Sequence, residues 1–159
     1  MSSSPQAQIT PVRVATPGEM KMAGISGEFT GPKGIAELWE KFLPYLDKLP
    51  VQVGNVAWGV IFGSDANGKF KYMPAVQVSD FSSLPAELEQ VTIPAQDYHV
   101  FAHGGNLDQL PDTIGQICRT GVFHAPLSAD QVGMMEYYGP GFDPMTGTGD
   151  MEVWVPSRS

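Results

Sequence analysis

Two glutamates near the end of the chain, Glu136 and Glu152, stand among aromatic residues in segments with the composition of β-strands. Because side chains alternate along a strand, Glu136 should share a face with Tyr138, and Glu152 should share a face with Trp154. A cation beside these rings would gain about 0.5 to 2 kcal/mol from each good cation–π contact, and the carboxylate would supply the opposite charge. Glutamate is rarely buried, so a solvated strand face is the simpler explanation for either residue. From the residues alone, both explanations stay open.

Other groups of reactive residues give weaker signals. His99 and His103 would share a strand face, and Asp143 and Asp150 flank a glycine-rich loop, but their spacing suits neither a zinc nor a calcium site. The chain has neither a GxSxG motif nor a phosphate-binding glycine loop, and no histidine pairs convincingly with Cys118. No local motif selects an axial histidine for haem. We therefore expect no metal ion, no cofactor and no covalent catalysis.

The composition describes one globular domain with an acidic surface. With 159 residues the chain has the length of one domain, and its hydrophobic content of 42% suits a single core. A net charge of -8 disfavours phosphate backbones, so nucleic acid is not an expected direct partner. No apolar run is long enough to span a bilayer, the N-terminal residues lack the regions of a signal peptide, and Cys118 is the single cysteine. We expect a cytoplasmic protein outside the membrane, with a disordered tail at residues 1–8 and one domain at residues 9–159.

Hydrophobic periodicity predicts two helices. An apolar stripe with helical spacing runs from Ile35 to Leu49, and Pro44 should kink or end that helix. Trp39 and Phe42 lie on this stripe and are assigned to the core. A second, weaker helix is predicted at residues 107–121.

The strands predicted around these helices suggest a repeated unit. Strand-like runs occupy residues 19–27, 55–63, 69–80 and 91–105 and both sides of the loop at 139–150, and Asn67-Gly68 predicts a tight hairpin. Strand, helix, strand and strand thus occur in this order twice, within residues 19–79 and 91–156. Two such units predict an α+β fold with an antiparallel sheet, pseudo-twofold symmetry and a ligand groove between the halves.

A series of short motifs then points to a known family. In order these are MAGISGEFTG, IAELWEKF, WGVIFG, FKYMPAVQV, IPAQDYHVFAHGG, DTIGQI, EYYGPGFDPMTGTG and MEVWVP. Together they resemble the effector-binding domain of AraC-type bacterial transcription activators, also called the GyrI-like small-molecule-binding fold, from Ile9 onward. The resemblance implies two strand-helix-strand-strand units around a groove that binds small, often cationic and aromatic molecules. It also implies that Glu136 occupies the position of the family's groove glutamate.

The resemblance further implies the aromatic walls of the groove, which are Trp58, Tyr72, Tyr98, Tyr138 and Trp154. Glu152 is kept as a second candidate because it shares a strand face with Trp154. Trp58 stands where tyrosine is more usual and Cys118 stands where a helix tryptophan is common, so the size and shape of the ligand stay open. Since the residues before Ile9 cannot hold a helix-turn-helix, we expect a stand-alone effector-binding protein.

The function predicted from these observations is the binding of a small cationic or amphipathic aromatic molecule. No direct nucleic-acid or membrane partner is expected, and a protein partner is left open. One alternative is a small-molecule hydrolase, in which Glu136 with Tyr138 or Tyr98 would activate water as a general base. Another is a protein-binding regulator of the gyrase-inhibitor type, whose partner the sequence does not identify.

Overall fold

The structure is a computed structural model, and it describes residues 11–30, 33–46, 49–54, 56–62, 69–82, 84–103, 106, 109–119, 132–143 and 147–156. The disordered tail predicted at residues 1–8 and the turn predicted at Asn67-Gly68 lie outside these residues. In the part of the chain that is described, no helix is both long and apolar enough to cross a membrane.

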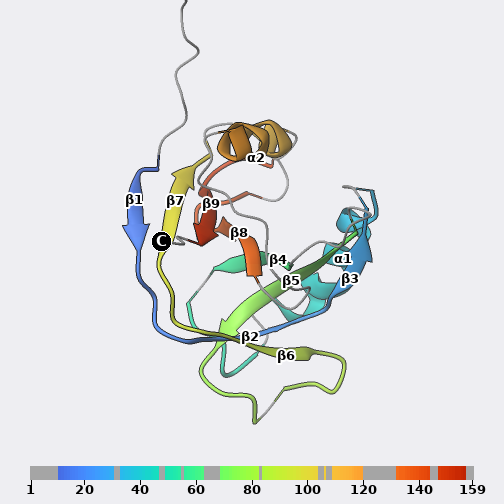
Figure 1. Ribbon diagram of the computed structural model, residues 1–159. Helices are drawn as coiled ribbons and strands as arrows, with labels where there is room; N and C mark the ends of the chain where they lie inside the picture. Colours follow the sequence, from blue (N-terminus) through green and yellow to red (C-terminus); the bar gives the residue numbers. More distant parts are fainter. Residues whose placement is uncertain are drawn as a thin grey trace, which may run out of the picture.

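The described chain forms one antiparallel sheet with two short helices (Figure 1). The strands are β1 (Arg13–Ala15), β2 (Met20–Gly24), β3 (Gly27–Phe29), β4 (Ala57–Phe62), β5 (Phe70–Val78), β6 (Glu89–Ile93), β7 (Tyr98–Ala102), β8 (Val132–Tyr138) and β9 (Met151–Pro156). The helices are α1 (Ile35–Phe42), which continues into a short 3-10 helix (Leu43–Tyr45), and α2 (Leu110–Arg119). The strand order in the sheet is β1-β7-β9-β8-β4-β5-β2-β6, and β3 pairs with β5.

The predicted α+β architecture is confirmed at the level of an antiparallel sheet with two helices. Along the chain, β2, α1, β4 and β5 are followed by β7, α2, β8 and β9, which is the predicted order of elements. The sequence did not indicate β1 or β3. The strand predicted at residues 19–27 corresponds to β2, and β3 begins at the last of these residues, Gly27.

The strand predicted at residues 91–105 is also two strands, because residues 94–97 separate β6 from β7. Pro94 has no N–H to donate, so it cannot continue a fully bonded strand at this point. On either side of the break the chain joins different neighbours, since β6 pairs with β2 and β7 pairs with β9. The break therefore carries the chain from one end of the sheet to the other.

Helix α1 is shorter than the apolar stripe that predicted it. It begins after Gly34, whose φ of 94° favours glycine, and it ends at Phe42, two residues before Pro44. Phe42 is fully buried and packs in one cluster with Val76 of β5. This contact confirms Phe42 as a core residue and fixes α1 against β5.

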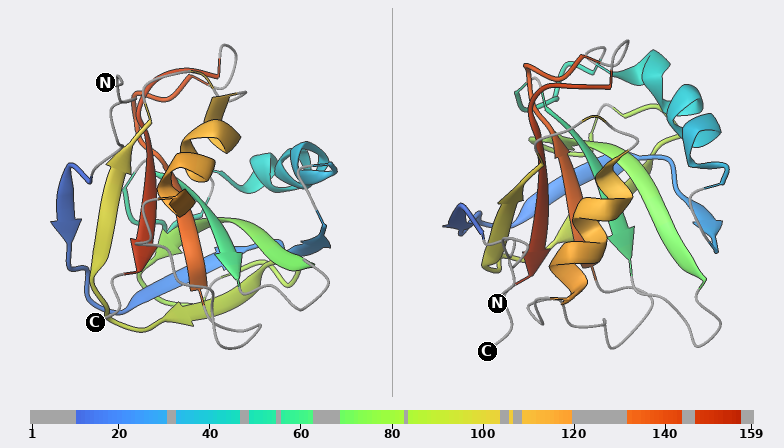
Figure 2. Two further views of the ribbon diagram at one scale, coloured as in Figure 1. Left: turned by 45° about the horizontal axis from the view of Figure 1, so that its top comes forward. Right: turned by 90° about the horizontal axis from the view of Figure 1, so that it is seen from above.

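The sheet has two buried faces with different coverings. The face that we call the helix face carries Val76 of β5 and Met134 of β8, and it packs against α1 and α2 respectively. The opposite face, which we call the inner face, is covered by side chains of the strands themselves. Its buried cluster comprises Met20, Met22, Trp58, Val60, Phe62, Met73, Ala75, Ile93, Tyr98, Val100, Met135 and Trp154. Because these residues come from strands all along the sheet, the sheet must curve around them, and Figure 2 shows β1 at the edge farthest from α1.

Candidate functional site

Glu136 lies near the middle of the sheet, on the helix face of β8. The Cα partner of Glu136 on β4 is Gly59, and on β9 it is Val153. The β4–β8 pair joins the strands that accompany α1 to the strands that accompany α2. Only 8% of Glu136 is exposed. The structure thus places a buried carboxylate where the two halves of the sheet meet.

Two tyrosine hydroxyls donate hydrogen bonds to the same oxygen of this carboxylate. The Tyr72 hydroxyl, from β5, lies 2.6 Å from Oε1 of Glu136, and the Tyr138 hydroxyl, from β8, lies 2.7 Å from it. Both tyrosines are buried. Among the described residues, none donates a hydrogen bond to Oε2 of Glu136. One oxygen is therefore held in place by the protein, while the other can accept a donor or face a charge.

Gly59 makes the contact between Tyr72 and Glu136 possible. A Cβ atom built on Gly59 would lie 2.2 Å from the Tyr72 hydroxyl and 2.8 Å from Oε1 of Glu136. Both distances are shorter than the closest contacts that Cβ atoms make with non-bonded atoms, and the Tyr72 ring is too rigid to bend away at its tip. Glycine in the middle of a strand is unfavourable by itself, and it marks a close approach by another group. Here the approaching group is the hydroxyl that holds the carboxylate.

Helix α1 contributes a further residue, Trp39, to this arrangement. The indole Nε1–H of Trp39 donates to the Tyr72 hydroxyl at 3.0 Å. The Trp39 ring also meets the Tyr138 ring edge to face, with centroids 5.5 Å apart. Periodicity assigned Trp39 to the core and left it out of the site, whereas the structure places this half-buried residue against two of the predicted site residues.

Among the described residues, Glu136 has no positively charged partner, because the ion pairs there join Arg13 to Glu152 and Lys69 to Glu28. Burial raises the pKa of the Glu136 carboxyl, and the hydrogen bonds from Tyr72 and Tyr138 only partly oppose that rise. The pKa of the Tyr72 hydroxyl and that of the Tyr138 hydroxyl are both raised well above the ordinary tyrosine value, mainly by burial and secondly by the charge of Glu136. Both hydroxyls therefore remain donors. A cation that reached this carboxylate would offset the desolvation cost of the charge.

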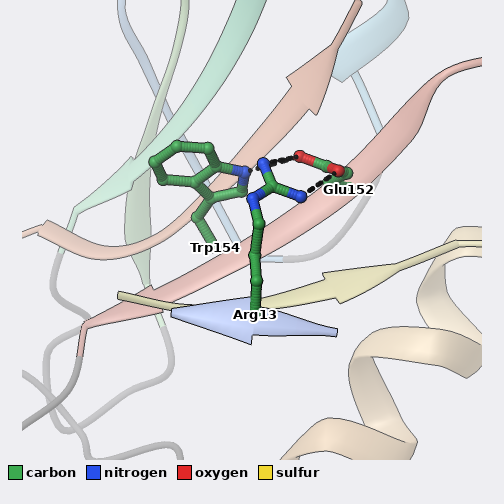
Figure 3. Close-up of polar contacts among 3 residues, drawn as sticks. All are labelled: Arg13, Glu152 and Trp154. Carbon is green, nitrogen blue, oxygen red and sulfur yellow. Dashed lines mark hydrogen bonds and ion pairs between the residues drawn. The ribbon is translucent and has the colours of Figure 1, made fainter. Parts of the chain in front are cut away.

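Glu152 has different surroundings on the inner face (Figure 3). Both of its oxygens accept hydrogen bonds from the guanidinium of Arg13, at 2.7 and 2.9 Å. The indole Nε1–H of Trp154 donates to Oε1 of Glu152 at 3.1 Å. Burial alone would raise the pKa of the Glu152 carboxyl, but the bonds from Arg13 and Trp154 bring it below its ordinary value. Glu152 is thus already neutralised by a cation of the chain.

An aromatic cluster lies next to Glu152 on the same face. Trp58 meets Trp154 edge to face with centroids 5.0 Å apart, and it meets Tyr137 in the same way at 5.2 Å. The Tyr98 ring lies 5.5 Å from Trp154. Trp58, Tyr98 and Trp154 are buried, and Tyr137 is half-buried. These rings fill the inner face at this end of the sheet.

The seven residues predicted for one groove are therefore divided between two faces. Glu136, Tyr72 and Tyr138 lie together on the helix face, and the inner face holds Trp58, Tyr98, Trp154 and Glu152. The reason is the register of β8 and β9, which pairs Glu152 with Tyr137, the neighbour of Glu136, so the two acids point in opposite directions. Whether either group binds a ligand stays a prediction.

Histidine, cysteine, aspartate and glutamate are the candidate metal ligands among the residues that the structure describes. In those residues, no three histidine, cysteine, aspartate or glutamate side chains come close enough together to hold a metal ion. The ring nitrogens of His103 contact the Thr113 hydroxyl and the Asn106 carbonyl at 2.7 Å each.

Solved structures resemble this fold over nearly its whole length. SAV2435 bound to tetraphenylphosphonium superposes with a TM-score of 0.70 at 17% identity, covering 92% of this chain and 93% of that one. An integron cassette protein from Vibrio cholerae superposes with a TM-score of 0.63 at 18% identity, covering 94% and 97%. EcmrR in a complex with DNA gives a TM-score of 0.66 at 13% identity, covering 92% of this chain and 57% of EcmrR. These likenesses show a shared fold.

Sequence comparison gives a relative and a family. The transcriptional regulator BrlR of Pseudomonas aeruginosa is 25% identical over 124 residues, which are 77% of this chain. The chain spans only 46% of the length of BrlR. The sequence pattern of the GyrI-like small molecule binding domain matches residues 10–158. The chain therefore belongs to the family of GyrI-like small-molecule-binding domains, as its motifs suggested.

Proposed function

We propose that this domain binds a small lipophilic cation in a groove between its two halves, with Glu136 as the countercharge and with Tyr72 and Tyr138 beside it. The observation that carries the proposal is the buried carboxylate of Glu136, which two tyrosines orient and no lysine or arginine of the described chain neutralises. Burying an ionised group costs free energy, and a ligand of opposite charge recovers part of it.

The position of Glu136 supports a groove between the halves. Outward from the β4–β8 pair, one side of the sheet continues through β5 to β2, and the other continues through β9 to β7. In chain order these are matching strands of the two strand-helix-strand-strand units, which favours the predicted pseudo-twofold axis at β4 and β8. Helix α1 covers one unit and α2 covers the other on the helix face. Glu136 lies on that face at the junction, where a groove between the helices would be centred.

Aromatic side chains at this junction suit a lipophilic cation rather than a hydrated one. The Tyr138 ring contacts the rings of both Trp39 and Phe142, with centroid distances of 5.5 Å and 4.9 Å respectively. Each ring that a cation faces can contribute about 0.5 to 2 kcal/mol. The related fold of SAV2435 was solved with tetraphenylphosphonium, which is a cation of this class.

Only three of the seven residues expected from the sequence lie at this groove, namely Glu136, Tyr72 and Tyr138. Trp58, Tyr98, Trp154 and Glu152 lie on the inner face and cannot line a groove on the helix face. Trp39 takes a place that the sequence prediction did not give it, since it contacts both tyrosines that flank Glu136.

The test compares two ions of the same shape and opposite charge. Tetraphenylphosphonium and tetraphenylborate are titrated into the protein at equal ionic strength, and binding is measured by calorimetry and by the shift of the unfolding temperature. We expect the phosphonium to bind and to stabilise the native state, and the borate to bind at least about tenfold more weakly. Equal binding of the two ions would mean that hydrophobic contact alone attracts them, and the role of Glu136 as countercharge would be wrong.

The hydrolase alternative is left with Glu136 and Tyr138, because Tyr98 lies on the opposite face of the sheet, and a turnover assay distinguishes it from binding alone. Reactive aryl esters incubated with the protein should remain intact apart from the background reaction. Ester cleavage that is abolished by Glu136→Gln would favour a hydrolase in which the carboxylate activates water.

A further inference from the structure

The inner face carries a second combination of carboxylate and aromatic ring, and an arginine of the chain occupies it. Nη1 and Nη2 of Arg13 donate to Oε2 and Oε1 of Glu152, so the guanidinium engages both carboxylate oxygens. Cζ of Arg13 also lies 5.7 Å from the centroid of the Trp154 ring (Figure 3). A planar fork to a carboxylate and contact with an aromatic face are two common ways in which proteins recognise guanidinium groups.

The walls of this arrangement are held by contacts that do not involve Arg13. The indole N–H of Trp154 fixes one oxygen of Glu152, and Trp58 and Tyr98 pack against the Trp154 ring. Tyr137 pairs with Glu152 across β8 and β9, and its ring is nearly parallel to that of Trp154, at 19° and 6.2 Å. Carboxylate and rings therefore keep their places when the arginine side chain is removed.

The segment that supplies the arginine is attached much more weakly than these walls. β1 has three residues, lies at the edge of the sheet and pairs with β7. Its neighbouring apolar side chains bury little surface, since Val12 and Val14 are 59% and 55% exposed. Short edge segments with few buried contacts are the parts of a fold that open first. The guanidinium and its binding site thus belong to parts of the molecule with different stability.

We propose that Glu152, Trp154 and Tyr137 form a second cation site, which recognises guanidinium groups, and that Arg13 is an internal ligand which an external guanidinium compound can replace. The carboxylate fork requires two N–H donors in one plane. Quaternary ammonium and phosphonium ions have no N–H and are poor ligands for this site. The site is independent of the groove at Glu136, because the two carboxylates lie on opposite faces of the sheet.

Tethering explains why an external ligand should bind the unmodified protein only weakly. A side chain held next to its site by a short connection competes with an effective concentration in the millimolar range. Replacing Arg13 by alanine removes this competitor and leaves the walls intact. Methylguanidinium chloride is a suitable probe, with tetramethylammonium chloride at equal ionic strength as the matched control.

The experiment follows the indole N–H resonance of Trp154 during titration of the wild type and of Arg13→Ala. We expect Arg13→Ala to bind methylguanidinium at least about tenfold more tightly than the wild type, about 1.4 kcal/mol, and not to respond to tetramethylammonium. Adding Glu152→Gln should weaken binding at least about tenfold, whereas adding Glu136→Gln should leave it unchanged. Equal binding with and without Glu152→Gln, or equal responses to the two cations, would overturn the proposal.

Two further arms keep the test decisive. If Arg13→Ala lowers the stability of the whole domain, the wild type is used, where methylguanidinium should speed hydrogen exchange at the Val12 amide, which donates to the Val100 carbonyl at 2.8 Å. Unchanged exchange would count against replacement of Arg13.

The source of the guanidinium is distinguished with acetyl-Val-Arg-Val-amide. Tighter binding of this peptide than of methylguanidinium indicates an arginine in an extended segment, and equal binding indicates a free small guanidine.

Discussion

Glu136 and Glu152 lie on neighbouring strands of one sheet, and they differ in burial, in hydrogen-bond donors and in the charge beside them. Glu136 is buried, receives two tyrosine hydroxyls and has no cation of the described chain beside it. Glu152 is half-buried, and its two oxygens accept hydrogen bonds from the guanidinium of Arg13. In the described residues, a cation of the chain therefore balances Glu152 and none balances Glu136, which is the difference on which the proposed role of Glu136 rests.

The largest effect on stability is expected from the tyrosines around Glu136. Tyr72→Phe removes a donor to the buried carboxylate and also leaves the Trp39 indole N–H without its acceptor, so unfolding should become easier by about 1.5 to 3 kcal/mol. Tyr138→Phe is the matched control, because it also removes a bond to Glu136 but leaves the Trp39 indole N–H with its acceptor. Chemical denaturation of both variants should show the greater loss for Tyr72→Phe. A greater loss for Tyr138→Phe would mean that the Trp39 bond contributes nothing.

A somewhat smaller effect is expected from the glycine that admits Tyr72. Gly59→Ala places a methyl group where the Tyr72 hydroxyl lies, so the domain should lose about 1 to 3 kcal/mol of stability. The displaced hydroxyl would also release Glu136, and tetraphenylphosphonium affinity should fall with it. Gly18→Ala is a control, since no atom lies within 4 Å of the Cβ added there. Unchanged stability and affinity in Gly59→Ala would contradict the close approach.

The pH dependence of stability should have opposite signs for the two acids. The pKa of Glu136 is raised on folding, so its contribution is full below the unfolded pKa of about 4.3 and is lost as pH rises through the folded pKa. The pKa of Glu152 is lowered, so its contribution is present above the unfolded pKa and is lost as pH falls through the folded pKa. Relative to the wild type, Glu136→Gln should gain stability with rising pH and Glu152→Gln should lose it. Denaturation curves of the three proteins from about pH 2 to about pH 8 provide the check, because the window of Glu152 lies below its unfolded pKa and that of Glu136 lies above it, and a common sign would refute it.

The smallest effect on stability is expected at the surface pair. The Arg13 side chain is 47% exposed, and exposed ion pairs contribute about 0.2 to 1 kcal/mol. Arg13→Ala should therefore lower the free energy of unfolding by no more than about 1 kcal/mol, and added salt should reduce the difference. A loss several times larger, independent of salt, would show that β1 is an essential part of the core.

The sequence predicted the local pairing of the site residues but not their arrangement around the sheet. Alternation along a strand correctly placed Glu136 with Tyr138, and Glu152 with Trp154. Which acid faces which side depends on the register between β8 and β9, and a shift of one residue would reverse it. The long loop between these strands does not specify that register, so the two faces could not be separated from the sequence.

Two residues of the candidate site show what periodicity leaves out. Helical spacing gave Trp39 an apolar face, but it contains no information on the hydrogen bond from the indole to Tyr72. Gly59, in the middle of β4, was the available signal, because a glycine inside a strand indicates that another group comes close. The signal does not say which group that is.

The most direct test of Glu136 as the countercharge is a calorimetric titration of tetraphenylphosphonium into the wild type, Glu136→Gln and Glu152→Gln. The amide keeps the size of the carboxyl and removes its charge, so Glu136→Gln should lose about 1.5 to 3 kcal/mol of binding free energy and still fold. Glu152→Gln should bind like the wild type, because its carboxylate lies on the other face of the sheet. Unchanged affinity in Glu136→Gln, or a greater loss in Glu152→Gln, would show that the cation is bound by the other acid or by neither.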